Sequence, residues 1–115
     1  TITEAGNQVL LAWIGTEPEV PYYRDDFLSM VYSSWMIRPV SALAMFQTRA
    51  GYLEEQIGQT QDMIETLIAE HSEHLNDPSH WRFCRYHLQN RRLMTLQTEL
   101  VWCSSVMHKL RKASD

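Results

Sequence analysis

The sequence contains little of what breaks a helix. Only four glycines and four prolines occur among its 115 residues, whereas six methionines accompany many Leu, Gln and Glu residues. This composition is typical of an all-helical chain. Long apolar runs are also missing, and no basic stretch leads into an apolar one near the first residues. We therefore expect neither a membrane span nor a signal peptide.

Cysteine is scarce as well. Cys84 and Cys103 lie nineteen residues apart in what reads as a single helix. Because a helix rises about 1.5 Å per residue, the two thiols are too far apart to form a disulfide with one another. Unbridged thiols favour a reducing, cytoplasmic compartment.

Patterns typical of enzymes are missing too. The sequence shows no Ser-His-acid arrangement, no Cys-His arrangement and no glycine-rich phosphate loop. Histidines and acids do gather between residues 70 and 80, where imidazole and carboxylate would suit a divalent cation. A solvated helix end explains the same cluster, and we predict no enzymatic activity, no metal site and no cofactor.

Prolines and glycines divide the chain into segments. Residues 15–21 separate a helix that Thr3 caps from a short amphipathic helix over roughly residues 24–35. Pro39 suits the start of a long helix, and residues 76–78 form a second break. We predict one domain in three parts: residues 1–3 as a stub, residues 4–35 as connecting and short helices, and residues 36–115 as a long helical hairpin.

Two long stretches carry apolar residues at alternating spacings of three and four, which is typical of a coiled-coil seam. The two patterns match when the chain folds back antiparallel, so that Leu53 pairs with Leu100. The fold class that follows is all-α, with two short helices before a long antiparallel coiled-coil hairpin. The predicted seam consists of Leu43, Phe46, Leu53, Ile57, Ile64 and Leu67 on the first arm and Tyr86, Leu93, Leu96, Leu100, Met107 and Leu110 on the second.

The distribution of charge supports this hairpin. Residues 41–77 hold seven acids and one base, Arg49, while residues 78–115 hold seven bases against Glu99 and Asp115. An acidic arm therefore faces a basic arm. Since an exposed ion pair contributes only about 0.2 to 1 kcal/mol, these charges select the pairing more than they stabilise it.

A second apolar row occupies the second arm, on the side away from the seam. A hairpin alone would leave these residues in water, and large exposed apolar patches usually mark a binding partner. A second copy, meeting the first across a two-fold axis, would cover them, and burial within one chain is the alternative. We predict a homodimer whose interface contains Val9, Leu10, Trp13, Trp81, Leu88 and Trp102.

The first residues resemble a junction in PadR-family transcriptional regulators. There the last wing strand of a winged helix-turn-helix runs into a helix that ends in Trp, a pattern matched by Ile2, Thr3, Gly6 and Trp13. Residues 21–46 are similar to the start of the C-terminal domain in the virulence-activator (AphA-like) branch of this family. The matching residues are Arg24-Asp25-Asp26-Phe27-Leu28, Pro39 and Ala42-Leu43, and the similarity extends to Leu110.

The resemblance implies a cytoplasmic bacterial regulator that acts as a dimer. A winged helix before Thr1 would bind operator DNA, residues 1–3 would be the stub of its wing, and this helical part would hold two such heads at a fixed separation. Because the net charge is −4, we do not expect this part to bind DNA by itself.

PadR relatives also bind flat aromatic effectors, which makes a small aromatic effector a further expectation. Aromatic side chains would form the walls of its pocket, and Arg24 or Arg91 would anchor a carboxylate. Ordinary core packing is the alternative for the aromatic residues. The candidate pocket residues are Trp13, Tyr22, Tyr23, Arg24, Phe27, Trp35, Arg91 and Trp102.

A different class of function stays open beside this one. A stand-alone helical adaptor would use Trp81, Leu88 and Trp102 to bind another protein instead of a second copy.

Overall fold

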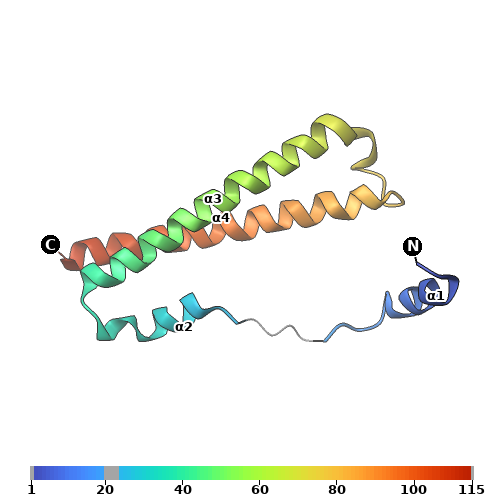
Figure 1. Ribbon diagram of the computed structural model, residues 1–115. Coiled ribbons are helices and arrows are strands. Elements are labelled where there is room, and N and C mark those ends of the chain that lie inside the picture. The colour runs from blue at the N-terminus through green and yellow to red at the C-terminus, as the bar shows by residue number, and fades with distance from the viewer. Residues whose placement is uncertain (1, 20–23, 115) are drawn as a thin grey trace.

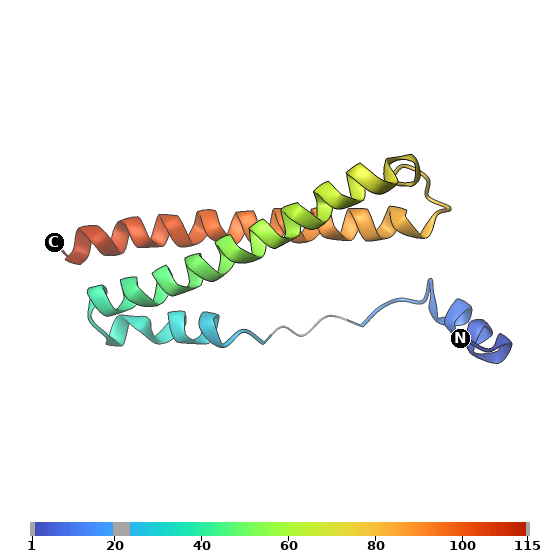
Figure 2. The ribbon, with the colours of Figure 1, turned by 45° about the horizontal axis from the view of Figure 1, so that its top comes forward.

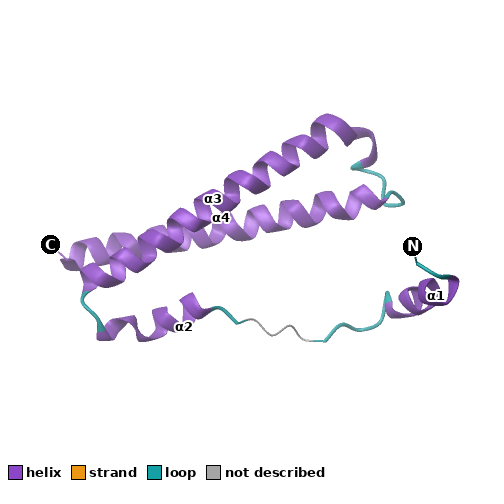
Figure 3. Cartoon of the chain, in the orientation of Figure 1, coloured by secondary structure: helices purple, strands orange, loops and turns teal. Residues whose placement is uncertain are grey.

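The computed structural model describes residues 2–19 and 24–114, and every regular element within them is a helix (Figure 1, Figure 3). The elements are α1 (Glu4–Trp13), α2 (Asp26–Ser33), the 3-10 turn η1 (Ser34–Met36), α3 (Pro39–His71), the 3-10 turn η2 (Ser72–His74) and α4 (Trp81–Ser114). The predicted all-helical class is therefore confirmed, as is the packing of a long helix against the C-terminal one.

Local signals in the sequence place the starts of the first three helices. The Gly6 N–H donates a hydrogen bond to Oγ1 of Thr3, the N-cap of α1, at 3.0 Å. The Phe27 N–H donates to Oδ1 of Asp25, the N-cap of α2, at the same distance. Each cap satisfies one backbone donor that the first turn leaves free. Pro39 is the first residue of α3, where its missing N–H costs nothing.

The helix boundaries differ from the predicted ones on both sides of α3. The chain tightens into η1 after Ser33, and the Ser34 hydroxyl donates to the Val31 carbonyl at 2.8 Å. The break at the hairpin tip is wider than residues 76–78. The Ser79 N–H donates to Oδ1 of Asp77 at 3.0 Å, which is an Asx turn, so α4 does not begin until Trp81.

Helices α3 and α4 run antiparallel side by side and form the hairpin, and Figure 2 shows α3 crossing over α4. All residues of the predicted seam are buried or half-buried. Two polar contacts bridge the arms: Arg49 with Glu99 at 2.8 Å, and Arg92 with Gln56 at 2.9 Å.

These two contacts are seven residues apart on each arm, so the register is uniform between them. The predicted pairing would set Arg49 opposite Ser104, whereas its partner Glu99 lies about five residues, or a little over one turn, nearer the hairpin tip.

Phe46 and Trp102 show the same offset, since their ring centroids lie 5.6 Å apart, whereas the predicted pairing sets Phe46 opposite Met107. The predicted register, which pairs Leu53 with Leu100, is therefore wrong by about one turn. A shift of one turn keeps both apolar stripes facing each other, so the spacing along each arm does not fix the register.

The main cluster of buried residues lies in the half of the hairpin that α2 covers, and Thr60, Ile64, Leu67 and Leu75 are buried nearer the tip. Phe46, Leu53 and Cys103 are fully buried in the main cluster, together with Ala50, Leu96 and Met107. Helix α2 packs Phe27 and Val31 against this cluster. The Phe27 ring meets Phe46 edge-on, with ring centroids 5.2 Å apart, a favoured geometry for aromatic pairs.

The single chain exposes more surface than its mass requires. Its accessible surface is 9156 Å², compared with about 6,500 Å² for a compact monomer of 13.5 kDa. Its radius of gyration is 20.0 Å, compared with about 13 Å for a compact domain of this length. Helix α1 buries none of its residues, and Figures 1 and 2 both show it apart from the hairpin.

Candidate dimer interface

Several large apolar side chains of α4 stay exposed outside the seam, although Trp102 is partly covered because its ring lies 5.6 Å from that of the buried Phe46. They are Trp81, Leu88, Met94, Val101 and Trp102, and we refer to them as the outer face of α4. Trp81 and Leu88 are each 62% exposed, and Trp102 is 39% exposed. A row of this size goes well beyond isolated surface residues and is typical of a binding surface.

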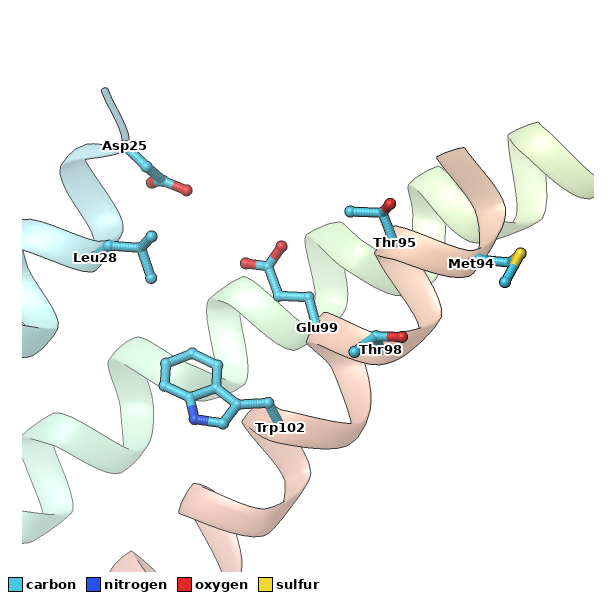
Figure 4. A pocket seen from close by; sticks show the side chains of 7 residues that line it. All are labelled: Asp25, Leu28, Met94, Thr95, Thr98, Glu99 and Trp102. Atoms are coloured by element: carbon cyan, nitrogen blue, oxygen red, sulfur yellow. The ribbon is translucent and has the colours of Figure 1, made fainter. Parts of the chain in front are cut away.

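A groove of about 510 Å³ lies between α2 and one end of this face (Figure 4). Figure 4 shows the Trp102 indole directed toward α2, and Leu28 directed from α2 toward α4. The carboxylates of Asp25 and Glu99 lie at the same place. The lining residues are Asp25, Leu28, Met94, Thr95, Thr98, Glu99 and Trp102. The groove is therefore apolar with an acidic edge.

Arg49 fixes the position of that acidic edge. Its guanidinium donates to Asp25 Oδ2 at 2.9 Å and to Glu99 Oε1 at 2.8 and 3.1 Å, and it lies 4.8 Å from the centre of the Phe27 ring. Burial by itself would lower the pKa of Arg49. The hydrogen bond and charge of Glu99, followed by those of Asp25, outweigh burial and raise that pKa above its ordinary value. Arg49 thus ties α2 to both arms.

The sequence contains an indication of this ion-pair cluster, which the total charge of each arm does not show. Arg49 is the one base among residues 41–77, and Glu99 is the one acid among residues 78–114. These two exceptions to the segregation of charge pair with each other. Asp25 joins them because it caps α2, which packs over the same part of α3.

Replacing Arg49 by Met is expected to destabilise the fold by about 2 kcal/mol, because two half-buried carboxylates would lose their cation. Because Met keeps an unbranched apolar side chain, the loss of stability would measure the contribution of the Arg49 charge and its hydrogen bonds. Urea unfolding followed by circular dichroism measures it. Arg92→Met is the control, since the exposed Arg92 makes one contact to Gln56 and its loss should cost under about 1 kcal/mol. Equal losses in the two variants would contradict this account.

The predicted dimerisation residues occupy two separate surfaces. Trp81, Leu88 and Trp102 belong to the outer face of α4, while Val9, Leu10 and Trp13 lie on α1, where they are 70%, 43% and 68% exposed. Leu28, Met94 and Val101 add to the exposed apolar surface and were not predicted. A spacing of seven residues from Leu88 selects positions 95 and 102. Met94 and Val101 lie one residue before these positions, so heptad spacing does not select them.

The predicted effector-pocket residues are spread over several places. Trp13 is on α1, Phe27 lines a hollow between α2 and α3, Trp35 lines another hollow with Leu110, and Trp102 lines the groove. The other members are placed as follows: Arg24 is exposed and pairs with Asp26 at 3.5 Å, Arg91 is exposed, and Tyr22 and Tyr23 lie outside the described residues. The effector pocket stays a prediction.

Histidines at the hairpin tip stack instead of converging on a common point. The rings of His74 and His80 lie face to face with centroids 3.9 Å apart, and His74 pairs with Glu73 at 3.2 Å. Over residues 2–19 and 24–114, no group of three His, Cys, Asp or Glu side chains is placed to hold a metal ion.

His80 makes the start of α4 sensitive to pH. The Arg82 N–H donates to His80 Nδ1 at 3.2 Å, a bond that needs this nitrogen unprotonated. Partial burial, then the charges of His74 and Arg82, lower the pKa of His80, while Asp77 and Glu73 act weakly in the opposite direction. Because the unfolded imidazole binds a proton more tightly, the stabilising effect is present above the ordinary pKa of about 6.5 and is lost on acidification through the lowered pKa.

We therefore expect the Arg82 and Phe83 amides to lose protection from hydrogen exchange between pH 7.5 and 5, relative to amides in the middle of α4. His80→Asn should remove this pH dependence, since Asn caps a helix without titrating. An unchanged pH dependence in His80→Asn would assign the effect to another group.

Neither cysteine is in a disulfide. Cys84 is exposed, and Cys103 is buried within the core. Burial, and then the charge of Glu99, raises the pKa of the Cys103 thiol, so it stays protonated at neutral pH.

No protein-family model, curated protein or solved structure matches this chain. Among the helices of the described residues, none has both the length and the apolar character needed to cross a bilayer. The exposed apolar surfaces of α4 and of the groove beside α2 are the features of the molecule that point to a function.

Proposed function

We propose that this chain is the dimerisation and regulatory domain of a PadR-like, winged-helix transcriptional regulator. Two copies would pair through their exposed apolar surfaces and set the distance between two DNA-binding heads. The observation that carries the proposal is the outer face of α4, a row of large apolar side chains left uncovered in a single chain whose own core is already complete.

The positions of the motif residues support the link to this family. Thr3 and Trp13 are the N-cap and the last residue of α1. Asp25 is the N-cap of α2, and Pro39 is the first residue of α3. Residues that define the resemblance in the sequence therefore sit at the boundaries of helices, where a family pattern is expected to be kept for structural reasons.

The shape of the hairpin suits a spacer between two heads. Each arm is a single helix of 33 or 34 residues, or roughly 50 Å, joined to the other along its length by a buried seam. Two such hairpins related by a two-fold axis would hold their first residues at a fixed separation. A symmetric dimer of this kind reads a palindromic operator whose half-site spacing equals the distance between its recognition helices.

Selection of binding sites from random duplex DNA tests the proposal, using the whole product of the gene that encodes this chain. The expected result is a palindromic site. Leu88→Asp, which charges the outer face of α4, should weaken binding to the full site at least about tenfold while leaving half-site binding unchanged. Failure to select any sequence, from a product that still pairs through this face, would favour a helical protein-binding adaptor.

A further inference from the structure

Helix α1 needs a surface that its own hairpin does not provide. It has ten residues, none of them buried, and its last two turns are apolar on nearly every side. An isolated helix of this length is only marginally stable in water, because a single turn must be nucleated at a cost that few hydrogen bonds repay. The cap at Thr3 helps its first turn alone. Packing against an apolar surface is the remaining source of stability.

The groove beside α2, together with the neighbouring outer face of α4, has the matching chemistry. Leu28, Met94 and Trp102 offer an open apolar surface to a helix face such as that of Val9, Leu10 and Trp13. Both surfaces are apolar and exposed in the single chain, so each would be removed from water by contact with the other.

The charges around these surfaces are complementary. Residues 4–19 contain Glu4, Glu17 and Glu19 and no base, whereas residues 81–98 of α4 contain four arginines and no acid. The arginines lie on α4 between the groove and the hairpin tip, where they can attract the acidic segment. At the groove itself the carboxylates of Asp25 and Glu99 are both paired with Arg49, which offsets their repulsion of that segment. Such complementarity fixes orientation and selects the partner.

The placement of α1 favours the groove of a second copy over its own. In both ribbon views α1 lies apart from the hairpin, toward the tip, whereas the groove lies beside α2. The excess of about 2,600 Å² over a compact monomer also exceeds the roughly 800 Å² that each partner buries in a standard interface. An exchanged helix would use this surplus, as helices do when identical chains swap an element.

We propose that α1 of each copy docks in the groove between α2 and α4 of the other copy. The proposal rests on the dimer of the proposed function and adds the identity of the segment that covers the groove. Each copy then contributes one α1 and one groove, and the dimer contains two reciprocal contacts.

Complementation between two variants tests the exchange. Trp13→Asp spoils α1, and Met94→Asp spoils the groove; both side chains are exposed, so neither change disturbs the core. Each variant alone should dimerise at least about tenfold more weakly than the unmodified chain. An equimolar mixture should associate more tightly than either variant alone, because a mixed dimer contains one intact α1 on one intact groove.

Sedimentation equilibrium measures this association, with circular dichroism to verify equal helicity. Gln8→Asp on α1 and Gln97→Asp on α4 are the matched controls, since both add the same charge at exposed positions outside the contact, and both should dimerise normally.

If α1 instead folds back onto its own chain, the mixture will associate no better than the separate variants, and the exchange is wrong while the dimer stands. Normal dimerisation of both variants would likewise refute the exchange alone. An unmodified chain that stays monomeric would refute the dimer and the exchange together.

Discussion

Leu53→Asp should unfold the hairpin. Leu53 is fully buried in the middle of α3, within the cluster that joins the two arms. An ionised carboxylate there would be without a partner, and the packing of Leu53 would be lost as well. The combined cost of at least about 4 kcal/mol is comparable to the lower end of the roughly 5 to 15 kcal/mol by which domains are stable. Far-UV circular dichroism at pH 7 should show a large loss of helix at 25 °C.

Gln61→Asp is the matched control, because it places the same side chain at an exposed position of α3. It should leave the helical signal unchanged. Lowering the pH should return part of the structure to Leu53→Asp, since a protonated carboxyl is less costly to bury. Full helicity of Leu53→Asp at pH 7 would mean that the seam does not hold the hairpin together.

Phe46→Ala has the second largest expected effect, a loss of about 3 to 5 kcal/mol in the free energy of unfolding. Phe46 is buried at the point where three helices meet: its ring lies 5.2 Å from Phe27 of α2 and 5.6 Å from Trp102 of α4. Its removal leaves a cavity and takes away the surface on which α2 rests. Urea unfolding, with the Trp fluorescence recorded beside the circular dichroism, measures the loss and the release of α2.

Phe83→Ala provides the comparison, because Phe83 is only half-buried and lies near the hairpin tip, where it contacts His87. It should cost clearly less than Phe46→Ala. If the two variants lost similar amounts of stability, the core would not be concentrated beneath α2.

The sequence was sufficient to predict the hairpin because its signal repeats. The spacing of three and four recurs along two arms, so an error at one position changes little, and every predicted seam residue is indeed buried or half-buried. The starts of α1, α2 and α3 were predictable for a different reason, since a cap or a proline acts within one turn.

The candidate interface was only partly predictable. Heptad spacing selected Trp81, Leu88 and Trp102, but Leu28 contributes to the groove through the packing of α2, which periodicity within α4 cannot show. The Arg49 cluster depends on three helices meeting at one point. The spacing of residues along one helix does not show which helices come together. Arg49 and Glu99, the single charges of opposite sign on their arms, indicated only the contact between α3 and α4.

The separation of α1 from the hairpin has a similar explanation. Its apolar face marks it as a helix that must be covered, but a sequence pattern does not say whether the cover comes from the same chain.

Sedimentation equilibrium of the unmodified chain, from low to high micromolar concentration, tests the central claim most directly. If a second copy covers the outer face of α4, the chain will sediment as a dimer across this range, and Leu88→Asp will shift it toward the monomer without loss of helix. A monomer at every concentration would contradict the claim and would leave Trp81, Leu88 and Trp102 as a surface for a different protein.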